Sequence, residues 1–592
     1  MNHIAEPRTR PIASRATIPL PSSRAICQSS ALCGQPTDMD KAWSASRSAS
    51  AISAMVSSKE SNRFELVLSI FVLPLGGTGS TSAIRELGPS GRGPASVVAV
   101  CAQHKTLQII RNSELSTEGS GHSASSSLPR TYPDAKRRLI VVLSCSLRYP
   151  MSPPVRRVAS SQDVPKSADV VIVGGGMAGV AAAYELAKRG TSVALIEKGV
   201  IAGEQSSRNW GWCRQQNRDA RELPLAQLAL GIWDGLNAEI GEETGFRRTG
   251  LVYATTRKAD LDTWERWGRV AKDFGVDTRM LGGSECSTML PGNSRSWIGG
   301  VHSPTDGRAE PELAVPALAR AAQRRGAVIV QNCAARELET EAGRISGVVT
   351  EKGSIRAASV LVAGGAWSGM FLRHHGIRFL QACVKSSSFY TVPAPAVTEG
   401  GVAMEHLTIR RRLDGGYTVG LSGLGQLQVT PWGILQARAF WTTFQVRRKG
   451  LTYAIGRQFF QGPEAILRWR ADGVSPFERI RTLDPRPDQH LIERGIARLV
   501  ATYPSLAGIR PAQSWGGMVD STPDAIPVIS SVTSHPGLFI SSGFSGHGFG
   551  IGPAAGRLAA DLIRADRPCV DPAPYRYERI IDGSDLGKPG ML

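Results

Sequence analysis

The periodicity of apolar and polar positions changes several times along the chain, most clearly between residues 169 and 199. Val170 to Val173 is a short apolar run rich in β-branched residues, typical of a strand buried on both faces of a parallel sheet. Small and helix-favouring residues follow from Met177 to Lys188, and Gly190 suits a C-terminal stop. Thr191 to Glu197 is again largely apolar and ends in an acid. The pattern predicts a strand, a helix and a second strand.

The turn before this helix contains Gly174, Gly176 and Gly179 in a G-x-G-x-x-G pattern. The first glycine permits a tight turn, the second lets the backbone approach a pyrophosphate, and the third lets helix and strand pack closely. The N–H groups at the helix N-terminus favour phosphate. Glu197 can accept hydrogen bonds from an adenosine ribose, and its charge disfavours a 2′-phosphate. We therefore expect a dinucleotide-binding unit.

Later segments predict further elements of both kinds. A helix is expected from Glu312 to Arg325, and a strand from Gly537 to Ser541. The stretches at 251–256, 385–392 and 409–421 have the pattern of strands in an antiparallel sheet.

Two stretches are not expected to bind a ligand. Residues 431–467 are predicted to be helical, and their aromatic side chains are interpreted as core and capping material rather than a substrate cage: Trp432, Phe440, Trp441 and Phe459. A second glycine-rich stretch at 420–425 lacks a strand–helix setting and is predicted to be a loop. A separate nicotinamide site is therefore not expected.

The first 150 residues lack the patterns of a domain. Ser, Arg, Gly and Pro dominate, without sustained periodicity. The apolar run from Leu66 to Leu75 is shorter than the about 20 residues of a membrane span. A transit peptide would share this composition but is usually much shorter. We expect residues 1–150 to be a disordered or mis-assigned extension, with natural translation starting at or near Met151.

Composition narrows the class of protein. The 592 residues carry a formal charge of +19, but no Lys/Arg run is flanked by aromatic residues, so nucleic-acid binding is not indicated. The nine cysteines are scattered without a C-x-x-C pair, which argues against a zinc site and a disulfide framework. A reducing compartment is favoured. We expect a cytoplasmic protein with no metal and no integral membrane segment.

Four segments resemble the D-amino-acid oxidase family of FAD-dependent amine and amino-acid oxidoreductases, which includes glycine oxidase, sarcosine oxidase and γ-glutamylputrescine oxidase. They are the strand–glycine–helix unit, SSRNWG at 206–211, VLVAGGAWS at 360–368, and residues 515–557. The last is the most specific, because it contains WGGMVDSTPD and the glycine-dense GFSGHG. The resemblance covers nearly all of residues 151–592.

The resemblance implies FAD as the cofactor. The implied cofactor-binding residues lie in these segments and near a strand that would carry the adenine: Gly174, Gly176, Met177, Ala178, Gly179, Glu197, Lys198, Ser206, Ser207, Arg208, Asn209, Gly211, Ala335, Gly364, Gly365, Trp367, Gly543, Phe544, Ser545, Gly546, His547 and Gly548. Relatives that bind flavin covalently use a His in the loop matching 206–211 or a Cys in the segment matching 515–524. This chain has Asn209 and no cysteine there, so FAD is expected to be non-covalent.

The resemblance also implies an α/β (α+β) fold. A Rossmann-like FAD-binding domain would be interleaved with an antiparallel-sheet substrate domain. The FAD-binding domain is expected at 151–250, 301–375 and 511–592, the last including a C-terminal tail. The substrate domain is expected at 251–300 and 376–510.

The implied reaction is oxidation of the C–N bond of an amine or amino acid, with hydride transfer to flavin N5 and hydrolysis of the imine. No side-chain base is required if the amine binds unprotonated. His547 is the candidate catalytic residue, because its ordinary pKa of about 6.5 suits control of amine protonation or polarisation of the flavin. The alternative is a loop histidine that contacts the cofactor only through its backbone. Lys385 is a candidate cation near the flavin.

One departure from the family bears on the substrate. Relatives that oxidise amino acids often carry an Arg in a pattern like W-A-G-L-R-P-x-T-P-D, where this chain has Val519 followed by Asp520. Valine cannot make the bidentate carboxylate contact, so an amine, a polyamine derivative or an N-alkylated compound fits as well as an α-amino acid. The run Arg410 to Arg412 could supply a carboxylate contact, although a solvated strand end is the favoured interpretation.

The sequence does not decide whether oxygen or a partner protein accepts the electrons. Opine-oxidising relatives use a partner protein. A non-catalytic FAD protein is the alternative from another class, since similar proteins serve as assembly factors for respiratory complexes. Nothing in the sequence requires that alternative, and the enzyme is favoured.

Overall fold

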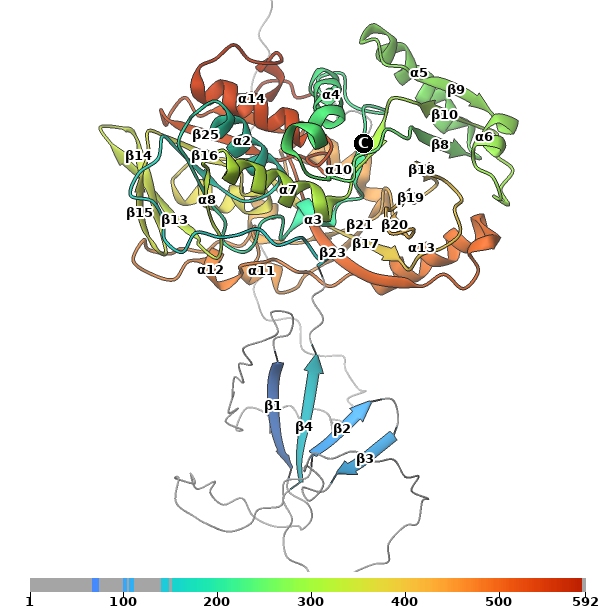
Figure 1. Ribbon diagram of the computed structural model, residues 1–592, viewed down its shortest axis with the longest axis horizontal. Helices are drawn as coiled ribbons and strands as arrows, with labels where there is room; N and C mark the ends of the chain where they lie inside the picture. Colours follow the sequence, from blue (N-terminus) through green and yellow to red (C-terminus); the bar gives the residue numbers. More distant parts are fainter. Residues whose placement is uncertain (1–65, 74–98, 104–105, 111–139, 148–151, 588–592) are drawn as a thin grey trace, which may run out of the picture. The chain divides into compact units, whose positions relative to one another are not determined.

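The computed structural model describes residues 66–73, 99–103, 106–110, 140–147 and 152–587 (Figure 1). The chain divides into two compact units, Met1–Tyr149 and Pro150–Leu592. In the first unit two pairs of antiparallel strands are described: β1 (Leu66–Leu73) with β4 (Ile140–Leu147), and β2 (Ala99–Gln103) with β3 (Thr106–Ile110). The sequence did not predict these strands. The other residues of the expected extension lie outside the described part.

The second unit contains a six-stranded sheet in the order β12-β6-β5-β16-β25-β24. Neighbouring strands are parallel except at one edge, where β24 is antiparallel to β25. The strands are β5 (Val170–Val173), β6 (Val193–Ile196), β12 (Val328–Val330), β16 (Ser359–Val362), β24 (Val528–Ser531) and β25 (Leu538–Ser542). The predicted strand–helix–strand unit is confirmed, and β5 and β16 are the two central strands.

Both faces of this sheet are buried, because alternate side chains of its strands enter different hydrophobic cores. Val170 and Ile172 enter the core that is shared with four helices: α2 (Met177–Lys188), α4 (Leu223–Ile240), α7 (Pro311–Arg324) and α14 (Gly552–Arg564). Val171 enters the core on the other face, shared with α8 (Ser368–His374) and an antiparallel sheet of β13 (Ala335–Glu341), β14 (Arg344–Thr350) and β15 (Gly353–Arg356). Burial on both faces explains the continuous apolar runs.

A ten-stranded sheet forms the other part of this unit, in the order β22-β21-β17-β20-β19-β18-β8-β10-β9, with β23 also paired to β17. Its strands are β8 (Leu251–Thr255), β9 (Arg279–Gly282), β10 (Gly299–Ser303), β17 (Ala382–Thr391), β18 (Gly401–Met404), β19 (Leu407–Arg411), β20 (Tyr417–Gly420), β21 (Gly425–Gln428), β22 (Leu451–Ala454) and β23 (Pro511–Ser521). Most neighbours are antiparallel, as predicted, but β18 with β8 and β21 with β22 are parallel.

The segments predicted for the two domains alternate between the two sheets along the chain. One strand crosses the expected boundary: β23 lies in 511–592, the last predicted segment of the FAD-binding domain, yet it pairs along its length with β17 of the larger sheet. Within the predicted loop at 420–425, residues 421–424 form the turn between β20 and β21, whereas Gly420 and Gly425 are the end residues of these strands.

Helices cover parts of the larger sheet, and short elements connect the two regions (Figure 1). The covering helices are α5 (Lys258–Asp273), α6 (Gly283–Met289) and α13 (Gln489–Thr502). The connecting elements include α3 (Gln205–Arg208), α12 (Pro476–Arg479), and the two-residue strands β7 (Trp212–Cys213) and β11 (Gly307–Arg308), which pair with each other.

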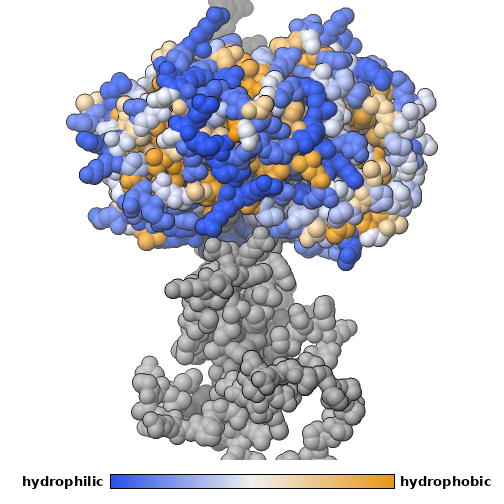
Figure 2. Space-filling model, in the orientation of Figure 1, coloured by the Kyte–Doolittle hydropathy of each residue, from blue (hydrophilic) through white to orange (hydrophobic). Residues whose placement is uncertain are grey.

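Residues 431–467 form short helices whose side chains are mostly not core. The helices are α9 (Pro431–Gln436), α10 (Trp441–Arg447) and α11 (Gln458–Gln461), and Gln436 is the one buried residue among them. Trp441 is 58% exposed, so its interpretation as core material is wrong, whereas Phe440 packs against a core. Figure 2 shows one face of the molecule, on which apolar residues lie between polar areas. Exposed apolar side chains in this segment are Ile434, Leu435, Trp441, Val446, Tyr453, Ile455, Phe460 and Ile466.

The crossing of α14 over α2 predicts a glycine requirement at Gly556. A Cβ at this position would lie 2.4 Å from the Cβ of Ala181 and 2.5 Å from its backbone carbon. Since the backbone of α2 cannot turn aside, Gly556→Ala must separate the two helices. We expect a loss of about 1–3 kcal/mol in the free energy of unfolding, measured from urea unfolding curves.

The matched control is Gly235→Ala on α4, where an added Cβ would meet no atom within 4 Å. It should be neutral or stabilise the protein by up to about 1 kcal/mol, because alanine favours a helix. Equal unfolding curves for the two variants would contradict the close packing of α2 and α14.

Candidate functional site

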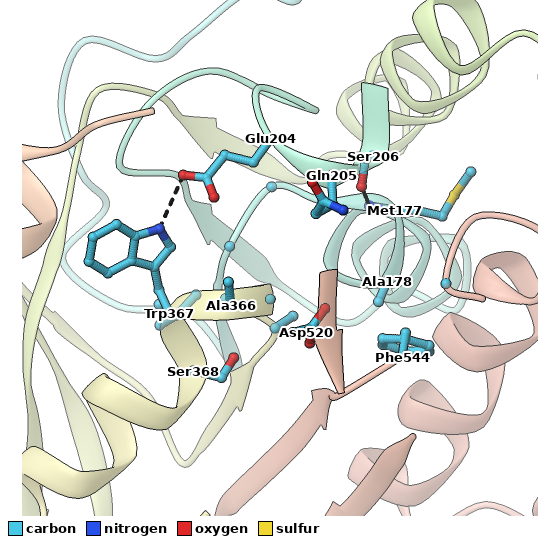
Figure 3. A pocket seen from close by; sticks show the side chains of 18 of the residues that line it. Met177, Ala178, Glu204, Gln205, Ser206, Ala366, Trp367, Ser368, Asp520 and Phe544 are labelled. Atoms are coloured by element: carbon cyan, nitrogen blue, oxygen red, sulfur yellow. Dashed lines mark hydrogen bonds between the residues drawn. The ribbon is translucent and has the colours of Figure 1, made fainter. Parts of the chain in front are cut away.

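A cavity lies at the C-terminal ends of β5, β6 and β16 (Figure 3). Ligands of open α/β sheets bind in the crevice outside the carboxyl ends of the strands. The free space is about 1260 Å³ when counted out to open solvent. Its lining comes from segments as far apart in the chain as the turn after β5, Ala335 and the loop after β25, so one ligand could contact several of them.

The glycine turn between β5 and α2 forms one wall of this cavity. Gly174 has a φ of +115°, and a Cβ there would lie 2.4 Å from the carbonyl oxygen of Ala363. A Cβ on Gly179 would lie 2.1 Å from the carbonyl oxygen of Gly174. Both positions therefore require glycine, and their packing brings the N-terminus of α2 to the cavity.

Glu197, directly after β6, is held against the glycine turn. Its Oε2 accepts a hydrogen bond from the Gly175 N–H at 2.7 Å, and its Oε1 accepts one from the Gly199 N–H at 2.7 Å. Desolvation raises the pKa of Glu197, while the charge of Lys198 and the two N–H donors oppose that rise. The backbone thus fixes a carboxylate on the cavity wall.

Lys198, Glu204 and Trp367 form a polar cluster further along the cavity. Lys198 Nζ donates to Glu204 Oε1 at 2.6 Å and lies 4.7 Å from the centre of the Trp367 ring. Trp367 Nε1–H donates to the same carboxylate oxygen at 3.1 Å (Figure 3). Although burial alone would raise the pKa of Glu204, the charges of Lys198 and Arg208 hold it below its ordinary value. Glu204 is therefore an anion with cations beside it.

Aromatic rings give this end of the cavity an apolar wall. Phe477 lies 5.8 Å from Trp367 and 5.9 Å from Phe371, measured between ring centres. Ala335, at the start of β13, lines the same cavity. Edge-to-face rings around a small residue suit a flat heterocycle.

A loop that begins with α3 covers the N-terminus of α2. The Met177 N–H donates to Ser206 Oγ at 2.8 Å (Figure 3). Asn209 holds the loop together, because its Nδ2 donates to the Ser206 carbonyl at 2.8 Å and its Oδ1 accepts from the Gly211 N–H at 2.7 Å. The loop conformation is therefore set by its own side chains.

Arg208 in this loop points away from the cavity. It is 4% exposed, donates to Ser152 Oγ at 2.6 Å and to the carbonyl of Gly516 at 3.3 Å, and also donates to the carbonyl of Leu483. Asp484 lies 3.4 Å from its guanidinium. In this structure the guanidinium connects the loop to three distant segments.

The third wall comes from β23 and the glycine-dense loop after β25. Val519, the position at which the resemblance implies an Arg in relatives that oxidise amino acids, lines the cavity. Asp520 also lines it and is 7% exposed. Asp520 Oδ2 accepts hydrogen bonds from the Gly543 N–H at 2.8 Å and from Gln381 Nε2 at 3.1 Å. Phe544 from the same loop faces the cavity beside Asp520 (Figure 3).

His547 is placed behind this wall. It is 8% exposed, and its Nδ1 lies 3.0 Å from an oxygen of the fully buried Glu222. Burial, followed by the positive charge of Arg218, lowers the pKa of His547 to about 4. The neutral ring therefore donates Nδ1–H to the Glu222 carboxylate. Its side chain is not among those that line the cavity, which leaves the predicted catalytic role without a supporting contact.

The structure brings most of the predicted cofactor-binding residues together. Those that line the cavity are Gly174, Gly176, Met177, Ala178, Glu197, Lys198, Ser206, Asn209, Ala335, Gly364, Gly365, Trp367, Phe544, Gly546 and Gly548. Those that do not line it are Gly179, Ser207, Arg208, Gly211, Gly543, Ser545 and His547. The second group lies next to the cavity and includes residues that shape its turns.

Several lining side chains were not predicted from the sequence: Glu204, Gln205, Phe371, Phe477, Asp520 and Ser541. Glu204 and Gln205 directly precede the predicted Ser206, so their position was a usable signal. Phe477 lies in a segment without a motif and reaches the cavity only through tertiary packing.

The arginine run at 410–412 differs from its favoured interpretation as a solvated strand end. Arg410 is 1% exposed, pairs with Glu310 at 2.8 Å and donates from Nε to the Trp210 carbonyl at 2.6 Å. Arg412 is 8% exposed and pairs with Asp414 at 2.8 Å. The interpretation is wrong for both residues, and neither lines the cavity.

Lys385 is likewise not at the cavity. It lies on β17, is partly buried, and its Nζ donates to the Arg486 carbonyl at 3.3 Å. Desolvation lowers its pKa.

The cavity wall carries unpaired polar atoms that a ligand would satisfy. Gln205 Oε1 and Ser541 Oγ are buried, line the cavity and have no hydrogen-bond partner. Such groups cost free energy unless a ligand or water pairs them, so the wall fits a cofactor with polar groups along its length. Within the described ranges, no three His, Cys, Asp or Glu side chains gather as a metal site would require. No helix in that part of the chain has the length and apolar character to span a membrane.

Comparison with known proteins shows the family of this chain. Residues 169–562 match the family described as DAO, FAD dependent oxidoreductase. The solved structure of L-amino acid deaminase from Proteus myxofaciens in complex with anthranilate superposes with a TM-score of 0.70. It is 31% identical, and the match covers 72% of this chain and 97% of that chain.

Curated relatives lead to the same family. Sarcosine oxidase subunit beta from Rhizobium meliloti (strain 1021) is 27% identical over 430 residues, which are 72% of this chain and 91% of that protein. Glycine oxidase from Geobacillus kaustophilus (strain HTA426) is 26% identical over 436 residues, 72% of this chain and 98% of that protein. The chain belongs to the DAO family of FAD-dependent oxidoreductases, and it is an enzyme that oxidises the C–N bond of an amine or amino acid.

Proposed function

We propose that the cavity holds FAD without a covalent bond and that the substrate is a small amino acid or its N-alkyl derivative. The observation that carries the proposal is the convergence of three segments on one long cavity: the glycine turn, the loop from Glu204 to Asn209, and the loop after β25. Oxidised FAD, when bound, would supply the two-electron acceptor for a reaction in which the substrate's α C–H bond breaks and its C–N bond becomes a C=N bond.

Each wall would meet a different part of the cofactor. The N-terminus of α2 and Ser206 would face the pyrophosphate, since helix N–H groups favour anions. Glu197 would accept the ribose hydroxyls, and Ala335 with the aromatic wall would enclose the adenine. The loop at 543–548 would lie against the flavin ring.

The relatives named above support an amino-acid substrate, whereas Val519 restricts how the carboxylate of such a substrate could be bound. These relatives are an L-amino acid deaminase, a sarcosine oxidase subunit and a glycine oxidase. Val519 in the cavity offers no hydrogen bond to a carboxylate, so residues outside this position would have to bind it. The chain's own task is to orient the α C–H of an unprotonated amine and to exclude water.

The acceptor of the electrons is oxygen or a partner protein, and we propose a reducing compartment such as the cytoplasm. The relative named sarcosine oxidase subunit beta supports a partner, because that name is one of a subunit. The reducing compartment is supported by unpaired thiols: Cys213, Cys286, Cys333, Cys383 and Cys569 are all free.

Glu197→Gln tests the placement of the cofactor. The amide keeps an oxygen for one backbone N–H but loses the charge and turns an NH₂ toward the other donor. We expect FAD affinity to fall about tenfold, the loss of roughly 1.4 kcal/mol from a charge-assisted hydrogen bond. Fluorescence titration of the apoprotein with FAD measures it.

Glu243→Gln is the matched control, because Glu243 Oε1 accepts the Gly245 N–H at 2.6 Å but does not line the cavity. Its FAD affinity should equal that of the wild type. An unchanged affinity in Glu197→Gln would place the cofactor elsewhere.

Acid precipitation tests the absence of a covalent link. We expect the yellow colour to stay entirely in the supernatant, because neither a His in the loop at 206–211 nor a Cys in 515–524 is present. A yellow pellet would contradict non-covalent FAD.

Anaerobic titration with a panel of small L- and D-amino acids, N-methyl amino acids, polyamine derivatives and simple amines tests the substrate class. We expect amino acids or their N-methyl derivatives to bleach the flavin absorbance and simple amines to leave it unchanged. Reduction by amines alone would contradict the amino-acid substrate. Admission of air then separates an oxidase, whose flavin recovers quickly, from a dehydrogenase.

A further inference from the structure

Asp520 is a buried acid on the cavity wall that has no cation beside it. Burial raises the pKa of this carboxyl, and the hydrogen bonds that oppose the rise come from neutral groups, the Gln381 amide and backbone N–H groups such as that of Gly543. Glu197 and Glu204 on the same wall both have Lys198 next to them. A negative charge on Asp520 therefore forms no ion pair within the part of the chain that the structure describes.

The groups that face Asp520 from neighbouring elements are neutral or acidic. Cys383 lies opposite it in the β17–β23 pairing, and burial raises the pKa of this thiol well above its ordinary value. Behind Cys383, the Glu464 carboxylate accepts the Cys383 N–H at 3.3 Å, and burial raises its pKa to about 7. Asp524, after the end of β23, is already paired with Arg579 at 3.1 Å. The cation on this side is Arg373, whose charge acts on Cys383 and on Glu464. Within the described residues, none of these groups forms an ion pair with Asp520.

Gln381 fixes the position of this carboxylate from the opposite side. Its Nε2 donates to Asp520 and, at 2.8 Å, to the Gly365 carbonyl, and its Oε1 accepts the Gly369 N–H at 2.9 Å. Gly365 itself lines the cavity. The Gln381 amide therefore holds the Asp520 carboxylate against the part of the cavity wall that follows β16. A carboxylate held in a fixed position acts on a bound ligand from a constant distance.

We propose that Asp520 sets the reduction potential of the bound FAD, by placing a negative charge on the cavity wall and by taking up a proton when the cofactor is reduced. The inference rests on the proposed placement of FAD in this cavity. Reduction adds electron density to the flavin, and a fixed anion nearby opposes it. The reduced cofactor in turn favours the protonated form of the acid.

The sign of the pH dependence follows from this coupling. Burial already raises the pKa of Asp520 with the cofactor oxidised, and added negative charge raises it further. Between these two pKa values, reduction binds one additional proton. One proton changes the reduction equilibrium tenfold per pH unit, which is about 30 mV for two electrons. In the pH window between the two pKa values, the reduction potential should fall about 30 mV more per pH unit than it does outside the window. Above the window, the potential should stay lower than it would be without the acid.

The test is the reduction potential of the FAD-loaded enzyme, measured from pH 5 to 9 against reference dyes. Asp520→Asn keeps the shape and an oxygen for the Gly543 N–H while removing the charge and the proton site. We expect its reduction equilibrium to be at least tenfold more favourable at the alkaline end, about 30 mV, and the steep window to disappear.

Glu243→Gln is again the control, because the Glu243 carboxylate accepts a backbone N–H, as that of Asp520 does, but does not line the cavity. It should keep the potential and the pH window of the wild type. If Asp520→Asn binds FAD with an unchanged potential and an unchanged window, the proposal for Asp520 is wrong and the cavity assignment stands. If the Glu197→Gln variant binds FAD as tightly as the wild type does, the cavity assignment is overturned instead.

A second variant covers the case in which Asp520→Asn does not fold. Gln381→Met removes the side-chain donor to the carboxylate and leaves the acid in place. Without that donor the ionised form is less stable, so the steep window should move to higher pH. A window at the wild-type pH would overturn the proposal.

Discussion

Direct backbone contact between the turn after β5 and the end of β16 is the constraint on which the site depends. The carbonyl oxygen of Ala363 occupies the space of a side chain at Gly174, and that of Gly174 occupies the space of a side chain at Gly179. Because nothing stands between these segments, the N-terminus of α2 and the residues after β16 meet at one edge of the sheet. The Glu197 carboxylate then joins the turn through two backbone N–H groups. The cavity between two glycine-rich segments follows from this contact.

The elements that could be predicted from the sequence are those whose structure is determined by residues close to one another in the chain. The apolar runs of β5 and β6, the helix α2 and the glycines between them follow from burial and turn geometry within some thirty residues. The strands β8, β17, β19 and β20 were predicted from alternation in the same way. By contrast, the side-chain pattern does not state that β23 pairs with β17, because its partner lies more than a hundred residues earlier in the chain.

The site residues divide by the same rule. Glycines and small residues near a motif were found, whereas Phe477 and Asp520 reach the cavity through contacts between distant segments. The arginines show the limit most clearly. Arg208 and Arg410 sit in or near predicted segments, yet their guanidinium groups are used inside the protein, on carbonyl groups and on Glu310. A sequence pattern identifies an arginine, but its partner decides whether the charge is available to a ligand.

The position of β25 has a consequence for synthesis of the chain. This strand lies between β16 and β24, and the loop after it forms one wall of the cavity. While residues up to about 510 have left the ribosome, β16 has an open edge and β17 lacks its long partner. Unpaired strand edges favour association with other chains, and pairing between distant segments is slow. The cavity wall is therefore incomplete until the last strands emerge, and this interval is when chaperones have most to protect.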